Sequence, residues 1–318
     1  MLLPIGLGGC RIYPYSGIPS SSESVKLSPR TENLSFLDYE KTPIHPTIQR
    51  IRKKGSYRIF RITFPSWPGL PEQEEQVVAY YYRPRGKGPR PAIVLLPIYD
   101  GTYLLERYLA NYLTRHGFAV LRFERSRKML QAQKGIAYTR EAMRQTVIDI
   151  RRGVDWLVEQ PHIDPQRLGI LGTSFGSVVA ALVAEADPRI KAAVLFLGGG
   201  DLGLLFCRSG EKEIIRFRER VMALNGYGPE EFCRIFSAAM REVDPLTHAS
   251  RLDPARTLMI NADWDQVVVP ECTKRLWEAS GRPRRILLAA GHYTAPLVYL
   301  WYVRSQARKH FAGLLQGP

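Results

Sequence analysis

Residues 167–179 read RLGILGTSFGSVV, and this stretch decides how the rest of the chain is interpreted. Its first half is a short apolar run that is typical of a buried strand, and its second half opens an apolar helix. The turn between them is Gly172-Thr173-Ser174-Phe175-Gly176, a G-x-S-x-G pattern. In a nucleophile elbow, such a turn holds a serine so that its hydroxyl is exposed. The alternative is a glycine-rich turn in which Ser174 only caps the helix.

The residue types in this turn suit acyl-transfer chemistry. Serine becomes an effective nucleophile only when a base accepts its proton. Gly172 and Gly176 carry no side chain, so the strand and the helix can approach closely. The start of the helix offers free N–H groups and the positive end of its dipole to a developing oxyanion. The N–H of Phe175 is therefore the first predicted oxyanion donor.

The length and composition of the chain bound the fold. Its 318 residues are 45% hydrophobic and 24% charged, which is ordinary globular composition. They fit one α/β domain with a lid, or at most two domains. No apolar run approaches the roughly 18 residues that a membrane span requires.

The net charge of +15 comes from 45 Lys and Arg residues against 30 Asp and Glu residues. Basic groups such as 52–54 and 216–220 indicate either a solvated, arginine-rich surface or attraction to a polyanion or an anionic membrane. We favour the solvated surface, because no nucleic-acid-binding motif accompanies the charge. The expected partner is a small molecule and no specific nucleic acid, with association with a membrane surface as the alternative.

The four cysteines do not form a metal-binding pattern. Cys10, Cys207, Cys233 and Cys272 include no C-x-x-C pair, and no histidine lies near them at zinc-finger spacing. We therefore expect no structural metal. A disulfide between Cys207 and Cys233 is possible, but the sequence does not indicate it.

The first ten residues read MLLPIGLGGC, and the part from Leu7 to Cys10 resembles the lipobox of bacterial lipoproteins. In that motif, small residues precede a cysteine that is lipidated after cleavage. Residues 13–30 are rich in Pro and Ser, as in a flexible tether. Against this interpretation, the segment lacks a positive n-region and its apolar part is short. Two alternatives stay open: an exported protein anchored through Cys10, and an unmodified cytoplasmic one. In both, we expect residues 1–46 to form a flexible segment outside the fold.

Strand signals recur along the rest of the chain. The first two segments have mixed polarity and are separated by a Pro/Gly-rich turn, which predicts an antiparallel hairpin. The later ones are short continuous apolar runs, as expected for parallel strands buried on both faces. The segments are Tyr57–Phe64, Gln76–Arg83, Ala92–Leu96, Ala119–Phe123, Leu168–Leu171, Ala192–Leu197, Leu258–Asn261 and Arg285–Ala289.

Helical patterns lie between the later strands. Strands that alternate with helices predict an α/β fold with a mostly parallel, doubly wound sheet, formed here by residues 47–318. The predicted helices are Tyr103–His116, 143–157, Val178–Glu185, Cys272–Ala279 and Thr294–Phe311.

One interval, residues 201–253, breaks this alternation with two extra amphipathic helices. The apolar stripe of the first runs from Ile214 to Leu224, and that of the second from Phe232 to Val243. Both stripes must be buried against something. The insertion is either packing on the sheet edge or a small lid that shapes an acyl pocket.

The candidate base is found by elimination. In an elbow enzyme of this fold, the acid and then the base follow the nucleophile, each just after a strand. Of the histidines after Ser174, His248 precedes the strand Leu258–Asn261 and its acids, and His310 lies in a basic terminal helix. His292 directly follows a strand, in Ala290-Gly291-His292, and is the predicted base.

The residues alone leave the acid open. Asp263 and Asp265 both lie close to the end of the strand Leu258–Asn261, and Asp201 follows the preceding strand in a glycine-rich turn. The acid's role would be to orient the imidazole and to stabilise the imidazolium.

A second oxyanion donor should come from the loop after the third strand, which is Pro97-Ile98-Tyr99-Asp100-Gly101. The N–H of Tyr99 is our prediction and the N–H of Ile98 is the alternative.

These features together resemble the α/β-hydrolase superfamily from about Ser56 to the end of the chain. Residues 149–157 and 163–176 are similar to the helix–strand–elbow block of dienelactone-hydrolase-like and acetyl-xylan-esterase-like serine hydrolases. Residues 258–270 match a second block, in which Asp265 takes the position of the acid. This chain has one more residue before Pro270 than the family pattern has, so Asp263 also stays possible as the acid. Residues 290–292 match the Gly-His block.

The resemblance implies a serine hydrolase that cleaves a small-molecule carboxylic ester without a cofactor. Ser174, Asp265 and His292 would be the catalytic triad. Two departures matter. First, dienelactone hydrolases carry a cysteine nucleophile, so the serine of this chain indicates an esterase instead. Second, Pro97-Ile98 replaces the His-Gly pair that the family usually has after the third strand. The alternatives are a thioesterase or peptidase with the same triad, and a non-catalytic binding module of this fold.

Overall fold

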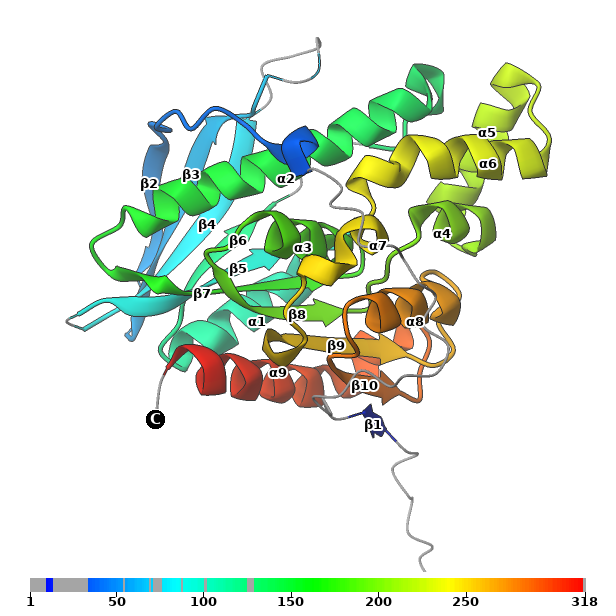
Figure 1. Ribbon diagram of the computed structural model, residues 1–318. Helices are drawn as coiled ribbons and strands as arrows, with labels where there is room; N and C mark the ends of the chain where they lie inside the picture. Colours follow the sequence, from blue (N-terminus) through cyan, green and yellow to red (C-terminus); the bar gives the residue numbers. More distant parts are fainter. Residues whose placement is uncertain are drawn as a thin grey trace, which may run out of the picture.

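Ten strands of the described chain form one sheet in the order β1-β10-β9-β8-β7-β5-β6-β4-β3-β2 (Figure 1). The computed structural model describes residues 10–13, 34–53, 55–68, 70, 76–86, 88–99, 102–124 and 129–316. Helices cover both faces of the sheet, as expected for a doubly wound α/β protein.

The strands from β5 to β10 run parallel to one another. Their residues are mostly buried on both faces, which explains their continuous apolar sequences. All of them coincide with predicted strands, so the parallel sheet is confirmed. The bounds are β5 Arg90–Leu96, β6 Ala119–Phe123, β7 Ile163–Thr173, β8 Ile190–Phe196, β9 Thr257–Ala262 and β10 Arg284–Leu288.

An antiparallel edge precedes the parallel strands. Strands β3 (Tyr57–Pro65) and β4 (Gln76–Pro84) form the predicted hairpin, and β4 joins the sheet through β6. A further edge strand, β2 (Thr47–Lys53), pairs with β3 and was not predicted. Every residue of β2 is exposed, so its sequence lacks the apolar alternation of a half-buried strand.

Two helical layers enclose two apolar cores (Figure 1). One face of the sheet is covered by α1 (Leu104–Arg115) and α9 (Thr294–Leu315). The other is covered by α2 (Gly135–Val158), α3 (Phe175–Ala186) and α8 (Pro270–Ala279). All five coincide with predicted helices. No helix in the described part of the chain has the length and apolarity needed to cross a membrane.

Two segments before Thr47 belong to the fold, and the prediction that this whole region lies outside it is wrong. Strand β1 (Arg11–Tyr13) pairs antiparallel with β10 at the sheet edge, and Cys10 beside it is partly buried. The short helix η1 (Leu34–Leu37) packs on α2, where Leu37 is fully buried and its carbonyl accepts a hydrogen bond from Arg151. The predicted lipobox residues 7–9 and most of the predicted tether lie outside the described residues.

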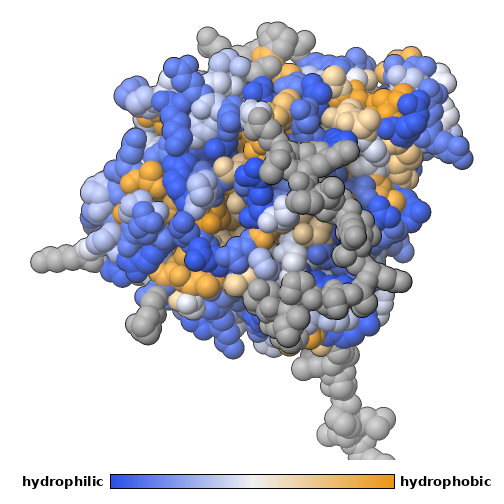
Figure 2. All heavy atoms as spheres, in the orientation of Figure 1, coloured by the Kyte–Doolittle hydropathy of each residue, from blue (hydrophilic) through white to orange (hydrophobic). Residues whose placement is uncertain are grey.

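The helical insertion lies between β8 and β9, at the upper right of Figure 1. A disulfide between Cys207 and Cys233, with 5.8 Å between the Cα atoms, joins its first helix, Leu202–Arg208, to its third, Pro229–Met240. Phe206 and Phe236 stack at 4.3 Å between ring centroids inside it. Figure 2 shows apolar residues gathered over this region of a mostly hydrophilic surface. The insertion comprises α4 (Leu202–Arg208), α5 (Lys212–Asn225), α6 (Pro229–Met240), η3 (Arg241–Val243), α7 (Pro245–His248) and η4 (Ala249–Arg251).

Candidate active site

Ser174 lies at a strained turn between β7 and α3. Its φ of 53° and ψ of −120° fall in a region that residues other than glycine rarely adopt. Such a conformation costs on the order of 1–3 kcal/mol and persists only where the surroundings enforce it. Here the Ser174 N–H donates a hydrogen bond of 2.8 Å to the carbonyl of Phe196 on the neighbouring strand β8.

The two glycines of the elbow are required by close backbone contacts. A Cβ on Gly172 would lie 2.0 Å from the carbonyl oxygen of Gly176. A Cβ on Gly176 would lie 2.4 Å from the carbonyl oxygen of Pro97, at the end of β5. Any side chain at either position would therefore push the elbow away from the sheet.

His292 lies within hydrogen-bond distance of Ser174. It follows β10 on a short loop, and the distance from His292 Nε2 to Ser174 Oγ is 2.9 Å. His292 is 8% exposed, so its ring is largely shielded from water. The loop is held by neighbouring backbone bonds, including one from the Ala295 N–H to the Gly291 carbonyl.

Asp265 completes a hydrogen-bonded chain behind the imidazole. Its Oδ2 atom lies 2.7 Å from His292 Nδ1. Its Oδ1 atom accepts hydrogen bonds from the N–H groups of Val267 and Val268, at 2.8 and 2.9 Å. With both oxygens engaged and only 3% of the residue exposed, the carboxylate is fixed in orientation.

The two alternative acids are engaged elsewhere. Asp263 forms an ion pair with Arg11 of β1 at 2.5 Å, on the sheet edge. Asp201 caps α4 through a 3.0 Å hydrogen bond from the Leu204 N–H and also pairs with Arg275. The structure thus brings Asp265, and neither alternative, to the predicted histidine.

The two alternative histidines also contact other groups. His248 is buried in the insertion, with Nε2 3.1 Å from the carbonyl oxygen of Glu242. His310 lies on α9 with Nε2 3.0 Å from the carbonyl oxygen of Arg256.

One backbone N–H of the loop after β5 already donates a hydrogen bond within the protein. The Ile98 N–H donates a hydrogen bond of 3.1 Å to Glu106, a fully buried carboxylate on α1. Tyr99 is the next residue, and its ring packs edge-on against the ring of Phe175 at 5.6 Å between centroids. Phe175 is the first residue of α3, so its N–H has no intrahelical acceptor. Asp100 and Gly101 of this loop lie outside the described residues.

A pocket of about 480 Å³ opens beside Ser174 and His292. Its apolar walls come from the elbow, α2 and the insertion, so the insertion lines the site rather than only the sheet edge. Such a lining suits an apolar ligand with a few fixed polar groups. The apolar lining includes Met129, Leu130, Met143, Val178, Leu202, Leu205, Phe206, Ile214, Met240, Val267 and Val268.

Polar residues of α5 and its start form one rim of this pocket. Tyr293, the residue after His292, donates a hydrogen bond to Glu211 at that rim. Partial burial, together with this bond, raises the pKa of Tyr293 to about 12, so the phenol keeps its proton at neutral pH. The contact joins the histidine loop to the insertion.

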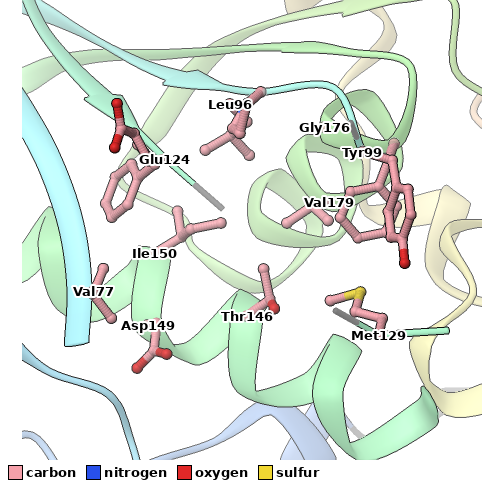
Figure 3. Close-up of a pocket in the computed structure, with 13 residues that line it drawn as sticks. Val77, Leu96, Tyr99, Glu124, Met129, Thr146, Asp149, Ile150, Gly176 and Val179 are labelled. Carbon is pink, nitrogen blue, oxygen red and sulfur yellow. The ribbon is translucent and has the colours of Figure 1, made fainter. Parts of the chain in front are cut away.

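A second, smaller cavity of about 40 Å³ adjoins the first and is drawn in Figure 3. Tyr99, Met129 and Phe175 line both cavities, and Val179 and Ile150 line only the small one. Figure 3 shows Met129 and Tyr99 on the same side of this space, with Asp149 and Glu124 at its other end. The shared side chains form the wall between the two spaces.

Three residues around the site were not predicted from the sequence. Glu106 had one visible signal, because it is an acid on the apolar face of α1 between Leu105 and Leu109. Glu211 and Tyr293 had none, since their contact joins positions 82 residues apart on irregular segments.

Comparison with known proteins supports the same fold. A model of the prolyl oligopeptidase family matches residues 133–280, which include the elbow and Asp265. The chain superposes with a TM-score of 0.63 on an acetyl xylan esterase from Paenibacillus sp. R4, at 17% identity over 83% of this chain and 89% of that one.

Two curated relatives match shorter stretches. A Mycobacterium tuberculosis protein named as a phosphoribosyl transferase is 34% identical over 94 residues, which is 30% of this chain and 20% of that protein. A Bradyrhizobium protein named as a 2-oxo-3-(5-oxofuran-2-ylidene)propanoate lactonase is 29% identical over 42% of this chain and 55% of its own length. The chain thus spans between one fifth and about half of these relatives.

Proposed function

We propose that this chain, a serine hydrolase of the α/β-hydrolase superfamily, cleaves a small-molecule carboxylic ester through an acyl-enzyme on Ser174. The observation that carries the proposal is the hydrogen-bonded chain from Ser174 through His292 to Asp265, at 2.9 and 2.7 Å. It opens onto an apolar pocket large enough for an acyl group.

The two bonds of His292 support the roles that we propose for it. With the proton on Nδ1, the ring donates to Asp265 and leaves Nε2 to accept the proton of the Ser174 hydroxyl. Ser174 Oγ then attacks the acyl carbon, and the imidazolium returns the proton to the leaving alcohol. The fixed carboxylate of Asp265 stabilises that imidazolium without accepting its proton.

The tetrahedral oxyanion needs donors that are in place before the reaction. We assign the N–H of Phe175 and the N–H of Tyr99 to this role. Two observations support the assignment: the Ile98 N–H is already bound to Glu106, and the Tyr99 and Phe175 rings pack together. Proline at 97 has no N–H to offer.

Water completes the cycle. It attacks the acyl-enzyme while His292 Nε2 accepts its proton, and the same base then returns that proton to Ser174 as the acid leaves. No metal or organic group is needed for these steps.

An ester is favoured over a peptide because the solved structure compared above is an acetyl xylan esterase and because the pocket is lined mainly by apolar side chains. The match to the prolyl oligopeptidase family supports a second candidate, cleavage of a peptide or other amide by the same residues. A thioester is a third acyl group that this chemistry could cleave.

The experiment is a substrate panel with the Ser174→Ala variant as control. Short and long acyl p-nitrophenyl esters, an acyl-CoA thioester and aminoacyl amides are compared by kcat/KM. We expect the esters to be turned over best, with loss of about 10³-fold or more in the variant. Turnover of amides alone would replace the ester assignment with the peptidase one. Equal activity of the variant and the wild type would reject both.

A further inference from the structure

A cationic cavity lies at the opposite end of the sheet from Ser174. Its volume is about 400 Å³, and its lining is Lys53, Arg58, Arg83, Pro84, Arg85, Gly86 and His162. These residues flank the amino ends of β3, β5 and β7, whereas Ser174 follows the carboxyl end of β7. A single water needs only about 10–15 Å³ by the same measure, so a ligand of several heavy atoms fits.

Three of the cations form one row across neighbouring strands. Lys53 of β2 lies directly opposite Arg58 of β3, and Arg58 lies directly opposite Arg83 of β4. Residues paired in this way project from the same face of a sheet with Cβ atoms about 4.5–5.5 Å apart. Like charges directly opposite one another are destabilising. The row therefore carries an unfavourable charge repulsion that a bound anion would relieve.

No carboxylate offsets this charge within the described part of the chain. Among the described residues, the lining contains no acidic side chain, and none of the ion pairs found elsewhere involves Lys53, Arg58, Arg83 or Arg85. The Nε atom of Arg58 is buried without a hydrogen-bond partner. Several basic side chains elsewhere are paired with acids, as in Arg167–Asp164, Arg189–Asp187 and Arg275–Glu271. This cluster thus differs from an ordinary solvated basic surface.

Local contacts hold the cations without neutralising them. The Arg83 guanidinium lies over the ring of Phe60 at 5.1 Å, a contact that orients the group but leaves its charge intact. The Arg85 N–H donates to the Ser56 carbonyl, and the Arg90 N–H donates to the His162 carbonyl, at 2.9 and 2.8 Å. The second bond ties the loop that carries His162 to the first residue of β5. The cavity is therefore built on strands and anchored turns.

We propose that this cavity is a binding site for a phosphate-type anion, separate from the hydrolase site. Arginine presents a planar set of donors that matches phosphate oxygens in pairs, and Lys53 adds a further point charge. The size of the cavity and the number of permanent charges favour a group with more than one negative charge. A free organic phosphate and a lipid phosphate headgroup share this chemistry.

The experiment is calorimetric titration of the full chain with inorganic pyrophosphate at low ionic strength. We expect saturable binding to one site, with Kd below about 1 mM. Arg58→Gln and Arg83→Gln should each weaken it by about tenfold, because each removes a charge-assisted hydrogen bond. Lys53→Gln, which changes an exposed side chain, should weaken it less. Ester hydrolysis by all three variants should match the wild type, which also shows that they fold.

The matched control is Arg234→Gln, which removes one charge from an exposed arginine of α6, remote from the cavity in sequence and absent from its lining. Its pyrophosphate affinity should equal that of the wild type. Absence of saturable binding to the wild type, or equal weakening by Arg234→Gln, would overturn the proposal.

A second arm distinguishes the two sources of the phosphate group. Phosphatidylcholine vesicles with and without phosphatidic acid are sedimented with the protein. Binding that requires phosphatidic acid and is displaced by pyrophosphate supports a lipid headgroup as the ligand. Pyrophosphate binding without vesicle binding supports a free phosphate compound. Vesicle binding that survives in the Arg58→Gln/Arg83→Gln double variant would contradict this site as its cause.

Discussion

Tyr293 donates a hydrogen bond to Glu211 and so joins the loop of His292 to the helical insertion. The insertion supplies much of the apolar wall of the pocket, through residues such as Phe206 and Ile214. The contact therefore couples the position of that wall to the residue next to the proposed base.

Removing this contact should change substrate binding more than chemistry. For Tyr293→Phe, we expect KM to rise about two- to tenfold for esters that fill the pocket, with kcat within about twofold. Initial-rate kinetics on short and long acyl esters measure both constants. Glu211→Gln keeps an acceptor at the same place and should have the smaller effect. A fall in kcat with unchanged KM would contradict the proposed role of the contact.

Met129 forms part of the wall between the main pocket and the small cavity of Figure 3. Met129→Ala should join the two spaces and shift the preference toward longer acyl chains, at a stability cost of about 2–5 kcal/mol. The ratio of kcat/KM for long and short acyl esters measures the shift. Met143→Ala is the matched control, because Met143 is also buried but lines only the main pocket. An equal shift in both variants would refute the idea of a dividing wall.

Asp265 and Asp263 are two residues apart but have different partners, His292 and Arg11 respectively. Asp265→Asn should lower kcat by about 10³–10⁴-fold, because the amide no longer holds the productive tautomer. Asp263→Asn should leave kcat within about twofold. Steady-state kinetics on one ester are sufficient to separate them. A large loss in the Asp263 variant and a small one in the Asp265 variant would reverse the assignment.

Glu185 on α3 is buried, and neither of its carboxyl oxygens has a hydrogen-bond partner in the described part of the chain. Burial raises its pKa well above the ordinary value of 4.5, the nearby Asp244 raises it further, and Arg251 opposes both. The unfolded chain therefore releases this proton at lower pH than the folded chain. Stability is lost as pH rises from about 4.5 toward the folded pKa, and the loss persists above it.

The Glu185→Gln variant should accordingly have a Tm a few degrees above that of the wild type at pH 8, with the difference vanishing near pH 4. Thermal unfolding across this range measures it. Glu159→Gln, an exposed acid at the end of α2, is the control and should show no such trend. A variant that is less stable than the wild type at pH 8 would show that Glu185 is ionised or usefully paired in the folded state.

The central part of the fold could be predicted because burial determines its sequence. Strands β5 to β10 are short continuous apolar runs, and the apolar residues of the helices between them recur at helical spacing. Both patterns can therefore be recognised in the sequence. Strand β2 could not be found in this way, since TIQRIRK lies exposed on the edge and is stabilised by pairing with β3. Strand β1 is three exposed residues whose partner lies more than 270 residues later.

The part of the candidate site that could be predicted is the part that follows from the order of nucleophile, acid and base along the chain. Ser174 and His292 follow their strands, and only one histidine fits. The choice between Asp263 and Asp265 depends on which carboxylate reaches the imidazole, which is a three-dimensional property. The same holds for the Cys207–Cys233 disulfide, since it depends on α4 packing against α6.

Lipidation of Cys10 stays a prediction, and a disulfide in the insertion would be favoured in the oxidising environment that export implies.

The central claim is that Ser174 is a nucleophile activated by His292. The most direct measurement is labelling of the intact protein with a fluorophosphonate, followed by mass spectrometry of the modified peptide. The account predicts one label, on Ser174, in the wild type and no label in Ser174→Ala, with labelling of His292→Ala slowed by orders of magnitude. Equal labelling of the wild type and Ser174→Ala, or no labelling of the wild type, would contradict it.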